Sequence, residues 1–169
     1  MNVRKSLILS VAGFAAMLLF AATAPAEPRA KVPGADAAIA RAESLLGTDR
    51  FGIYGCEALV AYAFDVPQEK YGWDGASETM YQTLLAQGEI HKDMNAPRGA
   101  LVFSRGFVGP HIDIALGDGT YISGGVQGLS PGYGDGSNIQ ILPTPSVGDA
   151  NYTYRGWSLG FPKEASDES

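Results

Sequence analysis

Cys56 is the only cysteine in this 169-residue chain, and the local sequence predicts that it begins a helix. It follows a glycine-rich entry within residues 51–64 (FGIYGCEALVAYAF), and Leu59, Val60 and Ala63 recur after it at helical spacing. The helix dipole and the unpaired N–H groups of a first turn favour the thiolate, which is the nucleophilic form of cysteine. The alternative interpretation of a lone cysteine is a small buried core residue.

His111 is the candidate base for such a nucleophile. It opens the strand-like run HIDIAL directly after Gly109 and Pro110, in a chain where the cysteine comes first. A histidine at the start of a strand can reach a neighbouring element and accept a proton there. The other histidine, His91, lies in a polar connector, and we interpret it as an exposed loop residue.

A base histidine needs a second group that accepts its other ring N–H. Asp113 qualifies because it lies two positions after His111, on the same face of the strand. Ser123 lies on the next strand, beyond the turn at residues 117–119. A three-residue loop would place Ser123 opposite Asp113, whereas a two-residue loop would place it opposite Ile114 on the wrong face.

The first 26 residues have the pattern of a secretory signal peptide. Arg4 and Lys5 precede an apolar run over residues 7–22, and the sequence APA at residues 24–26 has the small-x-small form of a cleavage site. We therefore expect an exported protein without a stable membrane anchor. No cysteine lies near the cleavage site, which argues against a lipoprotein.

Cleavage after residue 26 would leave 143 residues (169 − 26), enough for one domain with one core. It would remove two basic residues and no acidic one, which changes the net charge from −6 to −8. An acidic protein of this kind is a poor partner for nucleic acid or anionic lipid. We expect a monomer. We also expect no metal or other cofactor, because the two histidines lack ligand spacing with carboxylates. An unpaired thiol in an oxidising compartment is expected to be deeply buried or functional.

The elements that must position these residues begin with helices. Apolar residues at helical spacing predict helices over residues 35–46, 56–64 and 78–87. Gly47 is expected to close the first helix, and Ser77 and Gly88 to begin and end the third. Residues 68–75 have the composition of a surface loop.

Strands are expected in the second half of the chain. Short apolar or alternating runs separated by glycine turns predict strands over residues 100–104, 111–116, 120–123 and 138–142. The aromatic segment 152–161 is expected to close the sheet. Helices followed by closely spaced strands predict an α+β domain with an antiparallel sheet. The predicted organisation is a leader at 27–36, a domain at 37–162 and a polar tail at 163–169.

The order of these elements resembles the NlpC/P60 superfamily of papain-like cysteine peptidases. The resemblance extends over roughly residues 37–161, with PRGALVF at 97–103 similar to a PGDLVFF-like strand and HIDIALGDG at 111–119 similar to an HVGIYLGNG-like strand. It implies a papain-like fold with Cys56 as nucleophile and His111 as base. Ser123 falls at the position of a polar third residue, which is often histidine in this family.

This sequence departs from the family pattern next to the cysteine. The family motif Asp-Cys-Ser-Gly is GCEA at residues 55–58 here, and its missing Asp and Ser help to bind the free amine of a stem peptide. Glu57 could supply a carboxylate for such an amine, or it could be an ordinary first-turn acid favoured by the helix dipole. The glycine of the H-x-G pattern is replaced by Asp113. Tyr54 and Trp73 are candidates to line a cleft, with a place in the core as the alternative.

The expected function is a secreted cysteine hydrolase that cleaves peptide or amide bonds, with peptidoglycan stem peptides as the substrate implied by the resemblance. Cys56 would form an acyl-enzyme, and His111 would transfer the proton. Three alternatives remain open. They are an inactive binding module on the same fold, a CHAP-type amidase, and a secreted effector that acts on another amide or ester.

Overall fold

The computed structural model describes residues 31–106, 109–125, 139–143 and 153–163. The predicted signal peptide lies outside the described residues, as do most of the glycine-rich loop after Ser123 and most of the polar tail. No helix in the described part of the chain is both long enough and apolar enough to cross a membrane.

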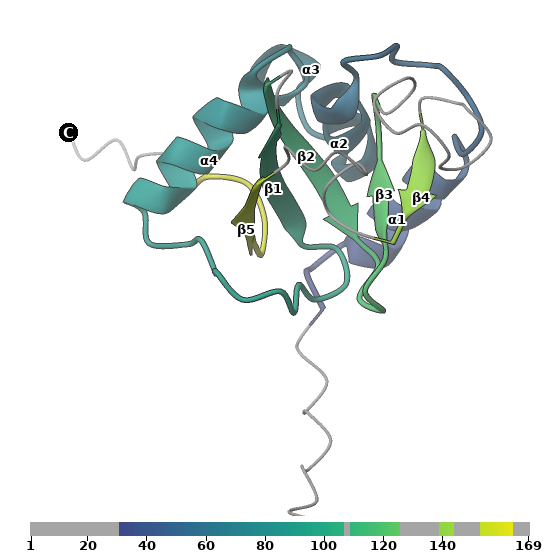
Figure 1. Ribbon diagram of the computed structural model, residues 1–169. Coiled ribbons are helices and arrows are strands. Elements are labelled where there is room, and N and C mark those ends of the chain that lie inside the picture. The colour runs from purple at the N-terminus through teal and green to yellow at the C-terminus, as the bar shows by residue number, and fades with distance from the viewer. Residues whose placement is uncertain (1–30, 107–108, 126–138, 144–152, 164–169) are drawn as a thin grey trace, which may run out of the picture.

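The described residues form an α+β structure of four helices and one five-stranded antiparallel sheet (Figure 1). The helices are α1 (Ala35–Glu43), α2 (Cys56–Phe64), α3 (Gln68–Tyr71) and α4 (Ala76–Ala86). The strands are β1 (Leu101–Gly106), β2 (Gly109–Ala115), β3 (Tyr121–Ser123), β4 (Gln140–Leu142) and β5 (Thr153–Ser158). The sheet order is β4-β3-β2-β1-β5, which confirms the predicted class.

The helices differ from the sequence prediction in three places. α1 ends three residues early, at Glu43, because residues 44–47 form turns. The predicted loop at 68–75 is wrong in its first half, where α3 forms and the buried Tyr71 ring packs on Phe161 with 4.7 Å between centroids. The prediction that Ser77 caps the third helix is also wrong. α4 starts at Ala76, and its N-cap residue is Gly75, so no side chain caps this helix.

The strands lie where the alternating pattern predicts them, with shifted ends. The β1–β2 hairpin extends to a pairing between Gly106 and Gly109, so β2 begins two residues before His111. The aromatic C-terminal segment forms β5, which pairs with β1 at one edge of the sheet. The expectation that this segment completes the sheet is confirmed.

The core lies on both faces of the sheet. On one face, Phe103, Ile112 and Ile114 join the apolar residues of α2 and α4 in the larger cluster. On the other face, Val102 and Trp157 pack with residues at the start of α1. Helix α2 packs on β2, α4 also contacts β2, and α1 contacts β3. Figure 1 shows α4 at the β1–β5 side of the sheet and α1 at the β3–β4 side. The N-terminus of α2 lies next to the end of β3, because Gly124 approaches Gly55 there.

Candidate active site

Cys56 is the first residue of α2, as the sequence predicts, and only 4% of its surface is exposed. The tight turn before it depends on Gly55, since a Cβ at that position would lie 2.4 Å from Phe51 Cβ and 2.6 Å from the Phe51 carbonyl oxygen. The first-turn N–H groups of a helix have no intrahelical acceptor, so those at Cys56 are directed away from the helix body. This geometry places the sulfur at the positive end of α2.

Two glycines at the end of β3 hold the sheet against this turn. A Cβ on Gly124 would meet the Gly55 carbonyl oxygen at 2.9 Å, and a Cβ on Gly125 would meet the Ile53 carbonyl oxygen at 2.4 Å. Gly125 also has a φ of 70°, in the left-handed region that favours glycine. Because these backbones touch, Ser123 is fixed close to the start of α2.

The strand register brings His111, Asp113 and Ser123 together. Leu116 N–H donates to the Thr120 carbonyl and closes a three-residue loop, so Ser123 pairs directly with Asp113. Of the two registers that the sequence allows, this is the one that makes Ser123 a neighbour of the histidine. His111 Nε2 lies 2.9 Å from Asp113 Oδ1 and 2.7 Å from Ser123 Oγ. All three side chains are buried.

These contacts define the roles of the two ring nitrogens. An ionised Asp113 can only accept a hydrogen bond, so Nε2 must carry a proton in order to donate to it. That N–H is shared with the Ser123 oxygen, which leaves Nδ1 for the hydrogen bond between His111 and Cys56. Burial alone lowers the pKa of His111, but the negative charges of Asp113 and Cys56 raise it well above its ordinary value.

The thiol of Cys56 has a raised pKa. Burial is the largest cause, because a thiolate is poorly solvated in the interior. The charge and hydrogen bond of His111 act in the opposite direction, and the neighbouring Glu57 raises the pKa further. Burial and Glu57 thus favour the thiol form of Cys56, and His111 favours the thiolate.

Glu57 is buried and does not face solvent. Its Oε2 accepts a hydrogen bond from the Cys56 thiol, with 2.7 Å between Sγ and Oε2. Its Oε1 accepts from the Ser77 hydroxyl at 2.6 Å and from the N–H groups of Gly75 at 3.3 Å and Ser77 at 3.4 Å. Both oxygens thus accept hydrogen bonds from this protein's own groups, and a role for Glu57 in binding a substrate amine stays a prediction.

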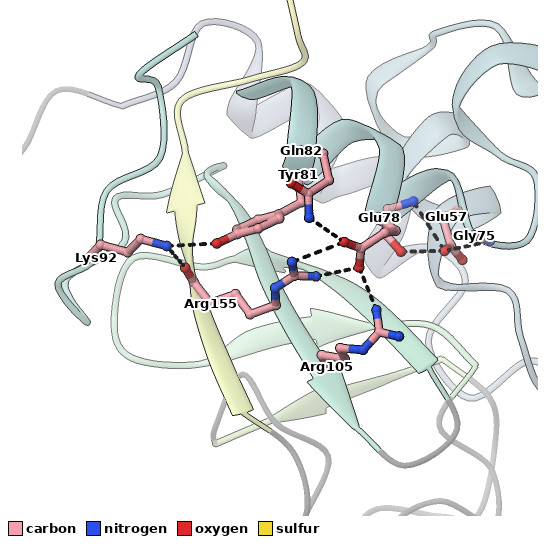
Figure 2. Close-up of polar contacts among 9 residues, drawn as sticks. Glu57, Gly75, Glu78, Tyr81, Gln82, Lys92, Arg105 and Arg155 are labelled. Atoms are coloured by element: carbon pink, nitrogen blue, oxygen red, sulfur yellow. Dashed lines mark hydrogen bonds and ion pairs between the residues drawn. The ribbon is translucent and has the colours of Figure 1, made fainter. Parts of the chain in front are cut away.

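The helix α4, which supplies those donors, is docked to the sheet by ion pairs next to Glu57 (Figure 2). Glu78 accepts hydrogen bonds from Arg155 of β5 and from Arg105 of β1, and Gln82 also donates to it. The Arg155 guanidinium also lies 3.6 Å from the centroid of the Tyr81 ring. These contacts fix the N-terminus of α4 relative to both the sheet and the start of α2.

No family model, curated protein or solved structure matches this chain.

The remaining candidate residues are exposed. Tyr54 and Trp73 are 61% and 47% exposed, so neither is a core residue. Their place in a substrate cleft stays a prediction. His91 is exposed as expected, but it also pairs with β5 through two backbone hydrogen bonds and stacks its ring on Trp157. Within the described ranges, no group of three His, Cys, Asp or Glu residues could hold a metal ion.

Sequence reasoning missed the link between Glu57 and the start of α4. The serine at position 77 has the form of a helix cap, and nothing local to it indicates that its hydroxyl serves a carboxylate 20 residues earlier. Ser104 was also missed. It lies opposite His111 on β1, and its buried hydroxyl has no hydrogen-bond partner in the part of the chain that the structure describes.

Proposed function

We propose that this protein is a cysteine hydrolase in which Cys56 is the nucleophile and His111 the proton-transfer group. One observation carries the proposal. A cysteine at the first residue of a helix is hydrogen-bonded to a buried histidine whose opposite ring nitrogen lies within 2.9 Å of Asp113 and 2.7 Å of Ser123. A nucleophile, a base and groups that orient the base are the parts that covalent catalysis requires.

The reactive form is a Cys56 thiolate beside a His111 imidazolium. The sulfur attacks the substrate carbonyl and forms a C–S bond, and His111 donates its proton to the leaving nitrogen as the C–N bond breaks. A water molecule then gives one proton to His111 and its hydroxyl to the acyl carbon. The C–S bond breaks, the acid is released, and the thiolate–imidazolium pair is restored.

The start of α2 supplies the stabilisation of the oxyanion in this mechanism. The Cys56 backbone N–H and the helix dipole point at the position where negative charge develops on the carbonyl oxygen. Asp113 and Ser123 orient the imidazole and stabilise its charged form. Asp113 supplies charge, whereas Ser123 supplies a neutral hydrogen bond.

The substrate class follows from the sequence resemblance and not from the geometry. The NlpC/P60 pattern favours a papain-like fold and peptide bonds in peptidoglycan, and the signal-like N-terminus favours an exported enzyme. The missing Asp and Ser beside Cys56, together with the occupied oxygens of Glu57, favour a substrate that is not held by a free amine at this point.

Purified peptidoglycan incubated with the protein tests this function. We expect soluble fragments and new amino groups, measured by mass spectrometry and amine labelling, with Cys56→Ala and His111→Ala inactive. His91→Ala is the matched control, because this exposed histidine does not contact Cys56, and it should retain activity. Equal product from the wild type and Cys56→Ala would refute the cysteine mechanism. Cleaved sugar–peptide amide bonds would indicate an amidase of the CHAP type.

A binding module is the second candidate, and the raised pKa of the buried Cys56 thiol favours it. A module of this kind would sediment with insoluble peptidoglycan and release nothing. Its binding would also survive Cys56→Ala. Release of fragments by the wild type alone would exclude this candidate.

A further inference from the structure

Glu57 is a buried carboxylate held by neutral donors. Its side chain is 2% exposed, and none of the ion pairs among the described residues involves it. It compensates for burial with four hydrogen bonds, three of them from the N-terminus of α4. Glu57 thus places a carboxylate charge between α2 and α4, and that charge acts on the Cys56 thiol.

The sulfur of Cys56 lies between this charge and His111. The titratable groups that act on the thiol are His111 of β2 and Glu57 of α2 itself, and Asp113 acts behind His111. An imidazolium Nδ1–H can donate to the sulfur, whereas a carboxylate can only accept from it. Since the thiol has a single proton, its hydrogen bond to Glu57 Oε2 uses that proton.

The proton of this hydrogen bond remains on sulfur. A thiol is a much weaker acid than a carboxylic acid, so Glu57 does not remove the proton that it accepts. Once the proton is lost, a thiolate and a carboxylate 2.7 Å apart repel each other. The sulfur must then move away from Glu57, while its hydrogen bond to His111 remains.

We propose that Glu57 is a positioning residue that holds Cys56 as a thiol in the free protein and releases it only when the sulfur leaves this carboxylate and keeps His111 as its partner. This inference rests on the proposed cysteine hydrolase, in which it governs when the nucleophile forms. On release the S–H bond breaks, the proton passes to water, and the thiolate pairs with the His111 imidazolium. The same hydrogen bond protects an unpaired thiol in an oxidising compartment, because oxidation proceeds through the thiolate.

Alkylation of Cys56 by iodoacetamide across pH tests the proposal. Glu57→Gln keeps the size of the side chain but removes the charge, so the midpoint of the rate profile should move to lower pH and the rate at pH 7 should rise roughly tenfold. A less basic thiolate is also a weaker nucleophile, so the midpoint is the decisive readout. Glu69→Gln is the matched control. It makes the same change at an exposed position in the first turn of α3 and should leave the profile unchanged.

A midpoint in Glu57→Gln that is equal to or above that of the wild type would overturn the inference. His111→Ala moves the midpoint in the opposite direction, upward, because it removes the group that favours the thiolate. The assay does not read hydrolysis. The midpoint in Glu57→Gln could shift downward although the wild type does not cleave peptidoglycan. That result would support the role of Glu57 in holding the Cys56 proton and would refute only the proposed activity.

The unaltered protein offers a second measurement that does not depend on the folding of a variant. Cys56 is the only cysteine, so the S–H stretching band in the infrared spectrum belongs to this residue alone. At neutral pH we expect one band, shifted to lower frequency than that of a free thiol in water by the hydrogen bond to Glu57. A band at the free-thiol frequency, or no band at neutral pH, would refute the proposal.

Discussion

Two buried carboxylates flank the candidate active site, and they act on their neighbours in different ways. On the sheet side, Asp113 lies 2.9 Å from His111 Nε2 and is one of the causes that raise the pKa of that histidine. On the helix side, Glu57 lies 2.7 Å from the Cys56 sulfur and adds to the burial that raises the pKa of that thiol. Both pKa shifts are upward, but only the first favours the reactive ion pair.

The difference comes from the charge that each neighbour acquires when it ionises. Histidine becomes a cation, which a carboxylate stabilises, whereas cysteine becomes an anion, which a carboxylate opposes. The two carboxylates also differ in their partners. Asp113 Oδ2 has no hydrogen-bond partner in the described part of the chain, while both oxygens of Glu57 are bonded. Asp113 thus bonds to His111 through Oδ1, and Glu57 links the Cys56 thiol to the N-terminus of α4.

Removal of the charge on the sheet side should have the largest effect on activity. Asp113→Asn keeps the shape of the side chain but no longer stabilises the imidazolium, so the pKa of His111 should fall and kcat/KM should drop by about 10²–10⁴. The pKa is measured from the NMR titration of the two histidine rings, with His91→Ala to assign them. An unchanged titration of His111, or a loss of activity below about threefold, would show that Asp113 does not govern the base.

Ser123→Ala tests how much of the effect on His111 comes from the hydrogen bond of Ser123 and how much from the charge of Asp113. The hydroxyl contributes a neutral hydrogen bond to Nε2, which is about half as strong as a charged one, so we expect a decrease in kcat/KM of about five- to tenfold. The pKa of His111 should change less than in Asp113→Asn, because the carboxylate remains. A larger loss than that caused by Asp113→Asn would reverse the roles of the two residues. The melting temperature of each variant controls for unfolding.

The sequence predicts the sheet side of this site better than the helix side. Period-two alternation fixes the face shared by His111 and Asp113, and the glycine turn limits the position of Ser123 to two registers, of which the structure has one. The choice between them depends on a single backbone hydrogen bond, from Leu116 to Thr120, which no side-chain pattern specifies.

On the helix side, the sequence predicts the position of Cys56 in its own helix but not the contacts between α2 and α4. The position of Cys56 at the start of α2 follows from helical spacing and the glycine before it, and the structure confirms it. The partners of Glu57 come from α4, and they depend on how two helices pack. Local rules assign Ser77 to its own helix as a cap, although its hydroxyl donates to Glu57. Contacts between elements override a local signal of this kind.

A third carboxylate, Glu78, is paired with arginines, and its removal should have the smallest effect of the changes considered. Hydrogen bonds from Arg155, supported by its charge and that of Arg105, hold the pKa of Glu78 at about 2 in the folded protein. A carboxyl whose pKa is lowered by folding stabilises the protein above its ordinary value of 4.5, and this contribution is lost as the pH falls from there toward 2. Glu78→Gln should therefore lower the free energy of unfolding in urea at pH 7 by about 1 kcal/mol or less, since the pair is partly exposed. The difference from the wild type should shrink below pH 4.5, whereas a difference that stays constant with pH would mean that packing, and not charge, accounts for it.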